Sequence, residues 1–201
     1  KHVEDPSRFG VAVRDGERIV EFVEKPRELI SNEALIGIYY VRELERLRSA
    51  IDFLFETELK GHGGEYQLTD AFDRMLKQDA VFKTAGVTEW LDCGTIPALT
   101  STTRVILDHE NHDVAGGRAD GSVIVPPVYL GPDAVIENSV VGPHVSIEAG
   151  ARISNSVLTR SIVFSGAQVD GSALDESLVG AHAEISAASG RMNVGDHSTV
   201  G

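Results

Sequence analysis

The sequence predicts two parts: a mixed α/β domain, followed by short strands that coil around one narrow core. Two observations support this, a change in composition along the chain and a regular spacing of aliphatic residues. Residues 1–108 hold ten of the twelve aromatic residues and fourteen of the eighteen Lys and Arg residues, whereas residues 109–201 hold twelve of the twenty glycines and no lysine. A shift of this kind marks a domain boundary. The polar stretch HENHDVAGGRADG predicts a linker over residues 109–121.

The second part carries an aliphatic residue at every fifth or sixth position. The series is Leu130, Ile136, Val141, Ile147, Ile153, Leu158, Val163, Val169, Leu174, Val179 and Ile185. A period near six fits neither a helix nor an isolated hairpin, but it suits short strands separated by regular turns. Half of the ten gaps are five residues long, so some corners must be tightened.

This spacing resembles the hexapeptide-repeat left-handed β-helix, in which three units make one triangular coil. On that resemblance, residues 122–201 form a left-handed parallel β-helix of about four coils. The register breaks over SAASGRMN, residues 186–193, which we interpret as a loop that leaves the coil. Open strand edges and flat faces favour self-association, so we expect a homo-oligomer formed through the β-helix.

The first part reads as a mixed sheet with helices. FGVAVRDGERIVEFVEKP, residues 9–26, predicts a hairpin that turns at Asp15-Gly16. EALIGIYYV, residues 33–41, and AVFKTAG, residues 80–86, predict two further strands.

Three segments of this part have apolar residues at helical spacing. They are residues 42–60, with a break near Ser49, residues 67–79, and residues 96–109. Pro97 is tolerated in the first turn of the last helix.

Charge and composition exclude several classes of partner. The formal charge of −13 is divided between the two parts, −6 before residue 109 and −7 after it, so we expect no nucleic-acid partner. No apolar run approaches the ~20 residues of a membrane span. The single cysteine excludes an internal disulfide, and no signal peptide is present. We therefore expect a cytoplasmic protein without a membrane partner. The chain begins with Lys1 and not Met, so we also expect that upstream residues have been left out.

Five short motifs in a fixed order carry a family resemblance. DPSRFGVAV, VEKP, SNEALIGIYYV, GGEYQLTD and WLDCGT precede the hexapeptide repeats. In this order they resemble the C-terminal half of a sugar-1-phosphate nucleotidyltransferase of the glucose-1-phosphate thymidylyltransferase or mannose-1-phosphate guanylyltransferase type. The resemblance implies that a sugar 1-phosphate attacks the α-phosphorus of a nucleoside triphosphate, with Mg²⁺ as cofactor, to give a nucleotide sugar and pyrophosphate.

The resemblance also implies the candidate catalytic residues. Asp92 matches the metal-binding aspartate of the family's WLD motif, and Mg²⁺ prefers oxygen ligands of this kind. Lys25 matches the lysine that contacts the sugar phosphate. The alternative interpretations are that Asp92 caps the following helix and that Lys25 is a solvated lysine at the end of a strand.

Four further residues are candidate substrate contacts by the same resemblance. Glu24 would accept hydrogen bonds from sugar hydroxyls, and Gly10 would let the backbone approach the sugar. Asn32 and Gly37 match the SN…G element near the sugar. The alternatives are a surface carboxylate, a turn asparagine, and glycines that serve a turn and a strand. Asp70 either orients this pocket or starts the next helix.

The resemblance covers only part of what the reaction needs. In the family, a second metal-binding aspartate and the G-x-G-x-R-x-x-P loop that holds the triphosphate belong to the N-terminal half, and neither is in this sequence. We therefore expect this chain to be inactive alone. Two alternatives remain: a hexapeptide-repeat acyltransferase, in which a histidine acts as general base, and a structural or regulatory oligomerisation module. We predict that His144, His182 and His197 are surface residues.

Overall fold

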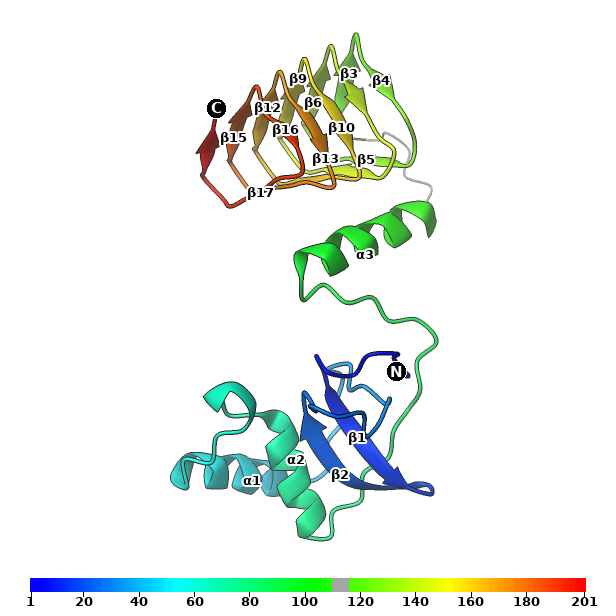
Figure 1. Ribbon diagram of the computed structural model, residues 1–201, viewed down its shortest axis with the longest axis vertical. Coiled ribbons are helices and arrows are strands. Elements are labelled where there is room, and N and C mark those ends of the chain that lie inside the picture. Colours follow the sequence, from blue (N-terminus) through cyan, green and yellow to red (C-terminus); the bar gives the residue numbers. More distant parts are fainter. Residues whose placement is uncertain (110–115) are drawn as a thin grey trace. The chain divides into compact units, whose positions relative to one another are not determined.

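The computed structural model describes residues 1–109 and 116–201 (Figure 1). These residues form two compact units, Lys1–Trp90 and Leu91–Gly201. Helix α3 (Ile96–His109) belongs to the second unit, although its residues were expected in the first domain. Residues 110–115 of the predicted linker lie outside the described residues. Among the described residues, no helix is long and apolar enough to cross a membrane.

The predicted hairpin of the first unit is confirmed. Strands β1 (Gly10–Asp15) and β2 (Arg18–Glu24) pair in antiparallel register across the Asp15-Gly16 turn, where Gly16 has a φ of 60°. A β-bulge at Val13/Arg14 shifts the register by one residue. Because a shift of one residue exchanges the faces of a strand, the bulge sets Gly10 opposite Glu24.

Two helices pack against this hairpin. α1 (Leu44–Glu56) is continuous through Ser49, so the expected break is wrong, and α2 (Leu68–Lys77) follows the short 3-10 turn η1 (His62–Gly64). The rings of Phe22, Phe72 and Phe82 lie 5.0 to 5.6 Å apart, centre to centre. The rest of this core is Ala12, Ile19, Ala50, Leu54, Ala71, Met75 and Ala80.

The two further strands predicted in the first unit are wrong. Residues 33 and 34 form isolated bridges, from Glu33 to His2 and from Ala34 to Val11. Residues 36–41 and 80–86 form no strand. A strand needs a hydrogen-bonded neighbour, and the described residues supply none for these segments.

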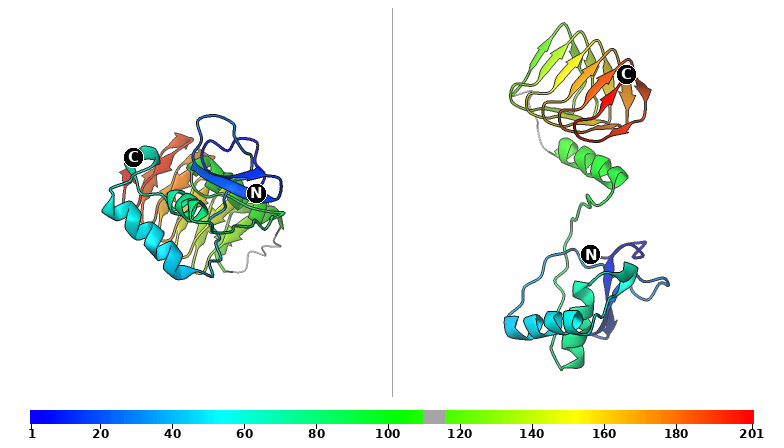
Figure 2. Two further views of the ribbon diagram at one scale, coloured as in Figure 1. Left: turned by 90° about the horizontal axis from the view of Figure 1, so that it is seen from below. Right: turned by 90° about the vertical axis from the view of Figure 1, so that its left-hand side faces the viewer.

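The second unit contains a parallel β-solenoid of three sheets, seen from two further sides in Figure 2. The first sheet consists of β3 (Arg118–Asp120), β6 (Val135–Glu137), β9 (Arg152–Ser154), β12 (Gln168–Asp170), β15 (Glu184–Ser186) and β18 (Thr199–Val200). The second sheet consists of β4 (Val123–Ile124), β7 (Val140–Val141), β10 (Val157–Thr159), β13 (Ala173–Asp175) and β16 (Ser189–Gly190). The third sheet consists of β5 (Val128–Leu130), β8 (Val145–Ile147), β11 (Ile162–Val163), β14 (Leu178–Val179) and β17 (Asn193–Val194). The solenoid therefore has about five turns, one more than expected.

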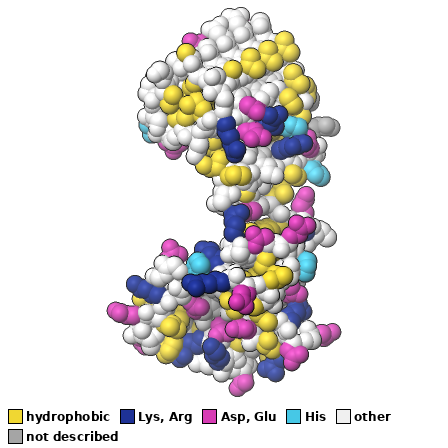
Figure 3. All heavy atoms as spheres, viewed as in Figure 1, with side chains coloured by type: hydrophobic (Ala, Val, Ile, Leu, Met, Phe, Trp, Pro, Cys, Tyr) yellow, Lys and Arg dark blue, Asp and Glu magenta, His cyan; other side chains and the backbone are white. Residues whose placement is uncertain are grey.

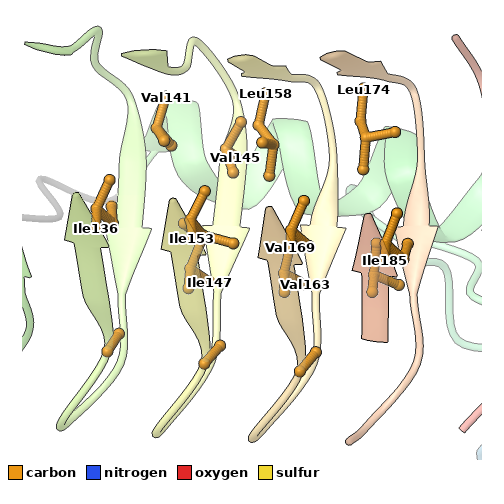
Figure 4. Close-up of a cluster of buried hydrophobic side chains, with 14 of the residues drawn as sticks. Ile136, Val141, Val145, Ile147, Ile153, Leu158, Val163, Val169, Leu174 and Ile185 are labelled. Carbon is orange, nitrogen blue, oxygen red and sulfur yellow. The ribbon is translucent and has the colours of Figure 1, made fainter. Parts of the chain in front are cut away.

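The predicted aliphatic series forms the solenoid core. All eleven residues are between 0 and 2% exposed. Figure 4 shows Ile136, Ile153, Val169 and Ile185 in one file along the axis, each from a successive turn. Burying a side chain of this kind contributes about 1.5–3 kcal/mol, so this column is the main source of stability in the unit.

The turns of the solenoid shorten along the chain. Val135 pairs with Arg152, 17 residues on, Gln168 pairs with Glu184, 16 residues on, and Glu184 pairs with Thr199, 15 residues on. The predicted tightening of corners is confirmed. The predicted loop over residues 186–193 is wrong, because β16 lies in this segment and Ser189 pairs with Ala173. A shorter corner, and not an excursion, breaks the spacing there.

Two lines of buried serines follow the corners. The hydroxyl of Ser156 donates to the carbonyl oxygen of Ser154 and accepts the backbone N–H of Ser172 in the next turn. Ser139 and Ser172 repeat this arrangement, and Ser161 and Ser177 form the second line. The hydroxyls satisfy backbone groups that the strands leave unpaired at the corners.

The outer faces of the three sheets differ. The third sheet contacts α3, since Asp108 Oδ1 lies 2.7 Å from His144 Nε2. The first sheet carries polar residues such as Arg152, Asp170 and Glu184. The second sheet exposes Val123, Val140 and Val157, which lie side by side in neighbouring strands.

Candidate functional site

The open end of the β1–β2 hairpin brings three predicted site residues together. Gly10 pairs with Glu24, and the backbone N–H of Lys25 donates to the carbonyl oxygen of Phe9 over 3.0 Å. The FG of the first motif thus faces the EK of the second motif. The hairpin and its bulge position Gly10, Glu24 and Lys25 in one cluster.

Glu24 is held by a hydrogen bond from α2. Its side chain is 16% exposed, and its Oε2 accepts the hydroxyl proton of Thr69 over 3.1 Å. Thr69 is buried in the first turn of α2. The sequence analysis considered Thr69 only as part of the helix start, so this contact was missed. The signal was present, since Thr69 lies within GGEYQLTD, one of the family motifs.

Gly10 lies directly beneath this contact. A Cβ atom on Gly10 would lie 2.8 Å from Glu24 Oε2 and 2.8 Å from Thr69 Cγ2, closer than real side chains approach. Glycine at this position lets the Glu24 carboxylate cross the strand. We expected the free space above Gly10 to admit a sugar, but Glu24 and Thr69 occupy it.

Lys25 supplies a cation beside this carboxylate. Its Nζ lies 4.0 Å from Glu24 Oε1, and its side chain is 37% exposed. Its backbone has a φ of 45°, in the left-handed region that costs an ordinary residue roughly 1–2 kcal/mol. The cluster therefore presents an ammonium group, which suits a phosphate, next to a carboxylate, which accepts hydrogen bonds from hydroxyl groups.

Two neighbouring groups have raised pKa values. Burial raises the pKa of Asp70, and the charges of Asp73 and Glu24 add to the effect, while Lys77 opposes it. Burial also raises the pKa of Tyr39, with a smaller contribution from Glu24. The surroundings of Glu24 are thus acidic and partly shielded from water.

Asp70 is packed closely. Its Oδ2 is buried and has no hydrogen-bond partner among the described residues. A Cβ on Gly61 would lie 2.3 Å from this oxygen. Asp70 does not begin α2, which starts at Leu68 with Gln67 as its N-cap.

Asn32 and Gly37 have other surroundings. The side-chain amide of Asn32 donates to the carbonyl oxygen of Val3 over 2.9 Å, so it ties residue 3 to the bridge at Glu33. Gly37 has a φ of 81° and open space around its Cα. Their predicted roles near a sugar stay predictions.

Asp92 belongs to the second unit. Its Oδ1 accepts the backbone N–H of Gly94 over 2.9 Å, and its carbonyl oxygen accepts the hydroxyl proton of Thr102. At the start of α3, the N–H of Ala98 donates to Thr95 Oγ1 over 3.3 Å. Thr95 therefore makes the capping contact, and the alternative interpretation of Asp92 as the helix cap is wrong.

The donor set at Asp92 fits a magnesium ion of the kind that proteins hold by few ligands. Mg²⁺ commonly takes only one or two carboxylates and fills its remaining positions with water and phosphate oxygens. Within residues 1–109 and 116–201, no group of three or more His, Cys, Asp or Glu side chains is arranged to hold a metal. Asp92 would thus act as a single protein ligand.

The repeat histidines differ from one another. His144 is largely buried and pairs with Asp108, so its prediction as a surface residue is wrong. His182 and His197 are exposed as predicted, and their rings stack 5.2 Å apart.

Comparison with known proteins identifies the family. Residues 1–109 match the nucleotidyl transferase family model, and the chain belongs to this family. It is 27% identical to glucose-1-phosphate thymidylyltransferase from Streptomyces antibioticus, over 99% of this chain and 61% of the relative. It is 28% identical to probable mannose-1-phosphate guanylyltransferase 1 from Oryza sativa subsp. japonica, over 91% of this chain and 49% of the relative. It is 30% identical to glucose-1-phosphate adenylyltransferase from Desulfitobacterium hafniense, over 90% of this chain and 45% of the relative.

The chain therefore spans about half the length of the relatives that it matches. These relatives are named for three different nucleotides and two different sugars. The resemblance to sugar-1-phosphate nucleotidyltransferases is thus supported at the level of the family.

Proposed function

We propose that this chain provides the sugar-phosphate side of a sugar-1-phosphate nucleotidyltransferase. The observation that carries this proposal is the cluster of Gly10, Glu24 and Lys25 at one hairpin end, inside the segment that matches the family. The names of the relatives support the substrate class, a sugar 1-phosphate and a nucleoside triphosphate.

In the proposed reaction, a phosphate oxygen of the sugar 1-phosphate attacks the α-phosphorus of the triphosphate. The bond from that phosphorus to the β-phosphate bridging oxygen breaks, and pyrophosphate leaves. Lys25 would reduce the repulsion between the two anions, and Glu24 would orient the sugar through its hydroxyls. Positioning and charge neutralisation are the main protein contributions to phosphoryl chemistry of this kind.

Magnesium is part of the proposal, with Asp92 as its ligand from this chain. When bound, the ion would supply positive charge to the triphosphate. Asp92→Asn keeps the shape of the side chain and removes its charge, so it should weaken magnesium binding measured by calorimetry while the fold is retained. Unchanged magnesium affinity in this variant would contradict the assignment.

The cluster can be tested without turnover. Glucose 1-phosphate and mannose 1-phosphate should bind the chain, with the affinity measured by titration calorimetry. Lys25→Ala should weaken binding by about 1.5–3 kcal/mol, the usual contribution of a hydrogen bond to a charged group. Lys83→Ala removes an exposed lysine elsewhere in the same unit and should leave binding unchanged. Equal affinity of the Lys25→Ala variant and the original chain would reject the site.

We further propose that the chain alone forms no nucleotide sugar. The supporting observation is that no G-x-G-x-R-x-x-P loop occurs in its sequence. Pyrophosphate release by the purified chain, over a panel of triphosphates and sugar phosphates with Mg²⁺, would overturn this proposal.

One observation keeps the acyltransferase alternative worth testing. His144 Nε2 lies 2.7 Å from Asp108 Oδ1, an imidazole–carboxylate pair of the kind that general bases use. Acyl transfer from an acyl-coenzyme A that is lost in His144→Ala and retained in His182→Ala would favour that function over nucleotidyl transfer.

A further inference from the structure

The first unit contains a large groove lined by residues outside the Gly10, Glu24 and Lys25 cluster. Its volume is ≈ 1490 Å³. Residues 33–43 form one side and residues 79–87 form the other, while Ala12, Phe22 and Phe72 lie at its floor. Pockets for small molecules have volumes of about 300–1,000 Å³, so this groove suits a larger occupant.

Both sides of the groove have unpaired backbone groups. Within the described part of the chain, no backbone hydrogen bond is donated or accepted by residues 36–41 or by residues 81–87. Both segments are extended past the point where they touch the hairpin or α2. Free N–H and C=O groups along an extended segment are a template for pairing with another strand.

The side chains of the segment at residues 36–41 are apolar on both faces. Tyr39 packs its ring against Phe72, 5.0 Å away, so it faces the core of the unit. Ile38 and Tyr40 alternate with it and are 81% and 89% exposed. Strands that are apolar on both faces belong inside a sheet that is covered on both sides. This segment thus has one covered face and one uncovered face.

The opposite side of the groove repeats this pattern. Phe82 packs against Phe22 in the core, whereas its neighbour Val81 is 78% exposed. In Figure 3, hydrophobic side chains reach the surface of this unit among charged ones. An occupant must therefore supply both strand edges and apolar side chains.

We propose that this groove binds a polypeptide that carries the remainder of a nucleotidyltransferase domain, whose strands enter between residues 36–41 and residues 81–87. This inference rests on the proposed function. Its occupant is argued from length, because the relatives extend well beyond the region that this chain matches. A second copy of this chain fits less well, since it brings the same two unpaired segments and no further strand.

The test uses the full chain and three partner polypeptides. Each partner contains the residues of one relative, from Streptomyces antibioticus, Oryza sativa or Desulfitobacterium hafniense, that lie outside the matched region. Sedimentation velocity should show a one-to-one complex with at least one partner. Hydrogen exchange of the amides in both segments should slow by about tenfold or more in that complex, since they become paired.

Matched variants locate the interface. Ile38→Asp and Tyr40→Asp place a charge on the uncovered face and should abolish the complex, and their high exposure means that they leave the folded unit intact. Leu29→Asp changes a residue that is 68% exposed but outside the groove, and it should bind as the original chain does.

Three results would overturn the inference. They are the absence of a complex with all three partners, a complex that survives Ile38→Asp and Tyr40→Asp, and self-association of the chain that these two variants abolish. The proposed function fails separately. A groove-dependent complex that releases no pyrophosphate from any pair of substrates would retain the interface and reject the activity.

Discussion

The hydroxyl of Thr69 donates its proton to Glu24 across 3.1 Å, so the first turn of α2 fixes the orientation of a carboxylate at the end of β2. Thr69→Val keeps the volume of this side chain but removes the donor. We expect affinity for glucose 1-phosphate to fall by roughly tenfold, because Glu24 loses the bond that orients it. Thr69→Ser restores the hydroxyl and should recover binding. Calorimetry checks both variants, and equal affinity of Thr69→Val and the original chain would contradict a positioning role.

Lys25 has a left-handed backbone, with a φ of 45°. Glycine adopts this conformation without steric cost, so Lys25→Gly should unfold at higher urea concentration than Lys25→Ala, by roughly 1 kcal/mol. Both variants lose the ammonium group, and both should lose affinity for sugar phosphates. Equal stability of the two would show that this backbone conformation carries no strain.

The raised pKa of Asp70 predicts a pH-dependent stability. The folded state holds the proton of Asp70 above the ordinary value of 3.8, so the associated stability is present below that value and is lost as pH rises through the folded pKa. Asp70→Asn removes this dependence and should be more stable than the original chain near neutral pH, with the difference shrinking below about pH 4. Urea unfolding across this range measures it. A difference independent of pH would place the cause outside this carboxyl group.

The serine lines predict a stability cost at one buried hydroxyl. Ser156→Ala leaves the N–H of Ser172 without its acceptor, so the free energy of unfolding should fall by about 1–3 kcal/mol. Ser189→Ala, at an exposed position of the same sheet, serves as control and should change stability by less than about 0.5 kcal/mol. Equal effects would show that water reaches the corner.

The proposed homo-oligomer has a candidate surface on the second sheet. Val123, Val140 and Val157 are exposed there, whereas α3 lies on the third sheet. Val140→Lys combined with Val157→Lys should convert the oligomer to a monomer in light scattering at micromolar concentration. A chain that is already a monomer would remove the proposal, and an oligomer that persists in the double variant would move the interface elsewhere.

The solenoid could be predicted well because its pattern is local and repeated. Each aliphatic residue of the series is buried by equivalent residues in the turns next to it, so spacing alone identifies the core. The number of turns was underestimated because β3 begins at Arg118, inside the predicted linker. The segment at residues 186–193 was misread because a corner shortened by one residue looks in sequence like a lost register.

The first unit was harder to predict, since its strands depend on distant partners. The alternation of apolar residues over residues 33–41 is typical of a buried strand, yet pairing requires a neighbour that these residues do not contain. The contact from Thr69 to Glu24 was missed for a similar reason, because 45 positions separate the two residues and no spacing rule links them.

The gradual loss of residues per turn, from 17 to 15, gives the prism a taper with a direction. Engineering that lengthens this rod beyond Val200 should therefore copy the narrow turns of its tip, since a wide turn grafted there would overhang the cross-section below it and leave its inward side chains without a neighbour.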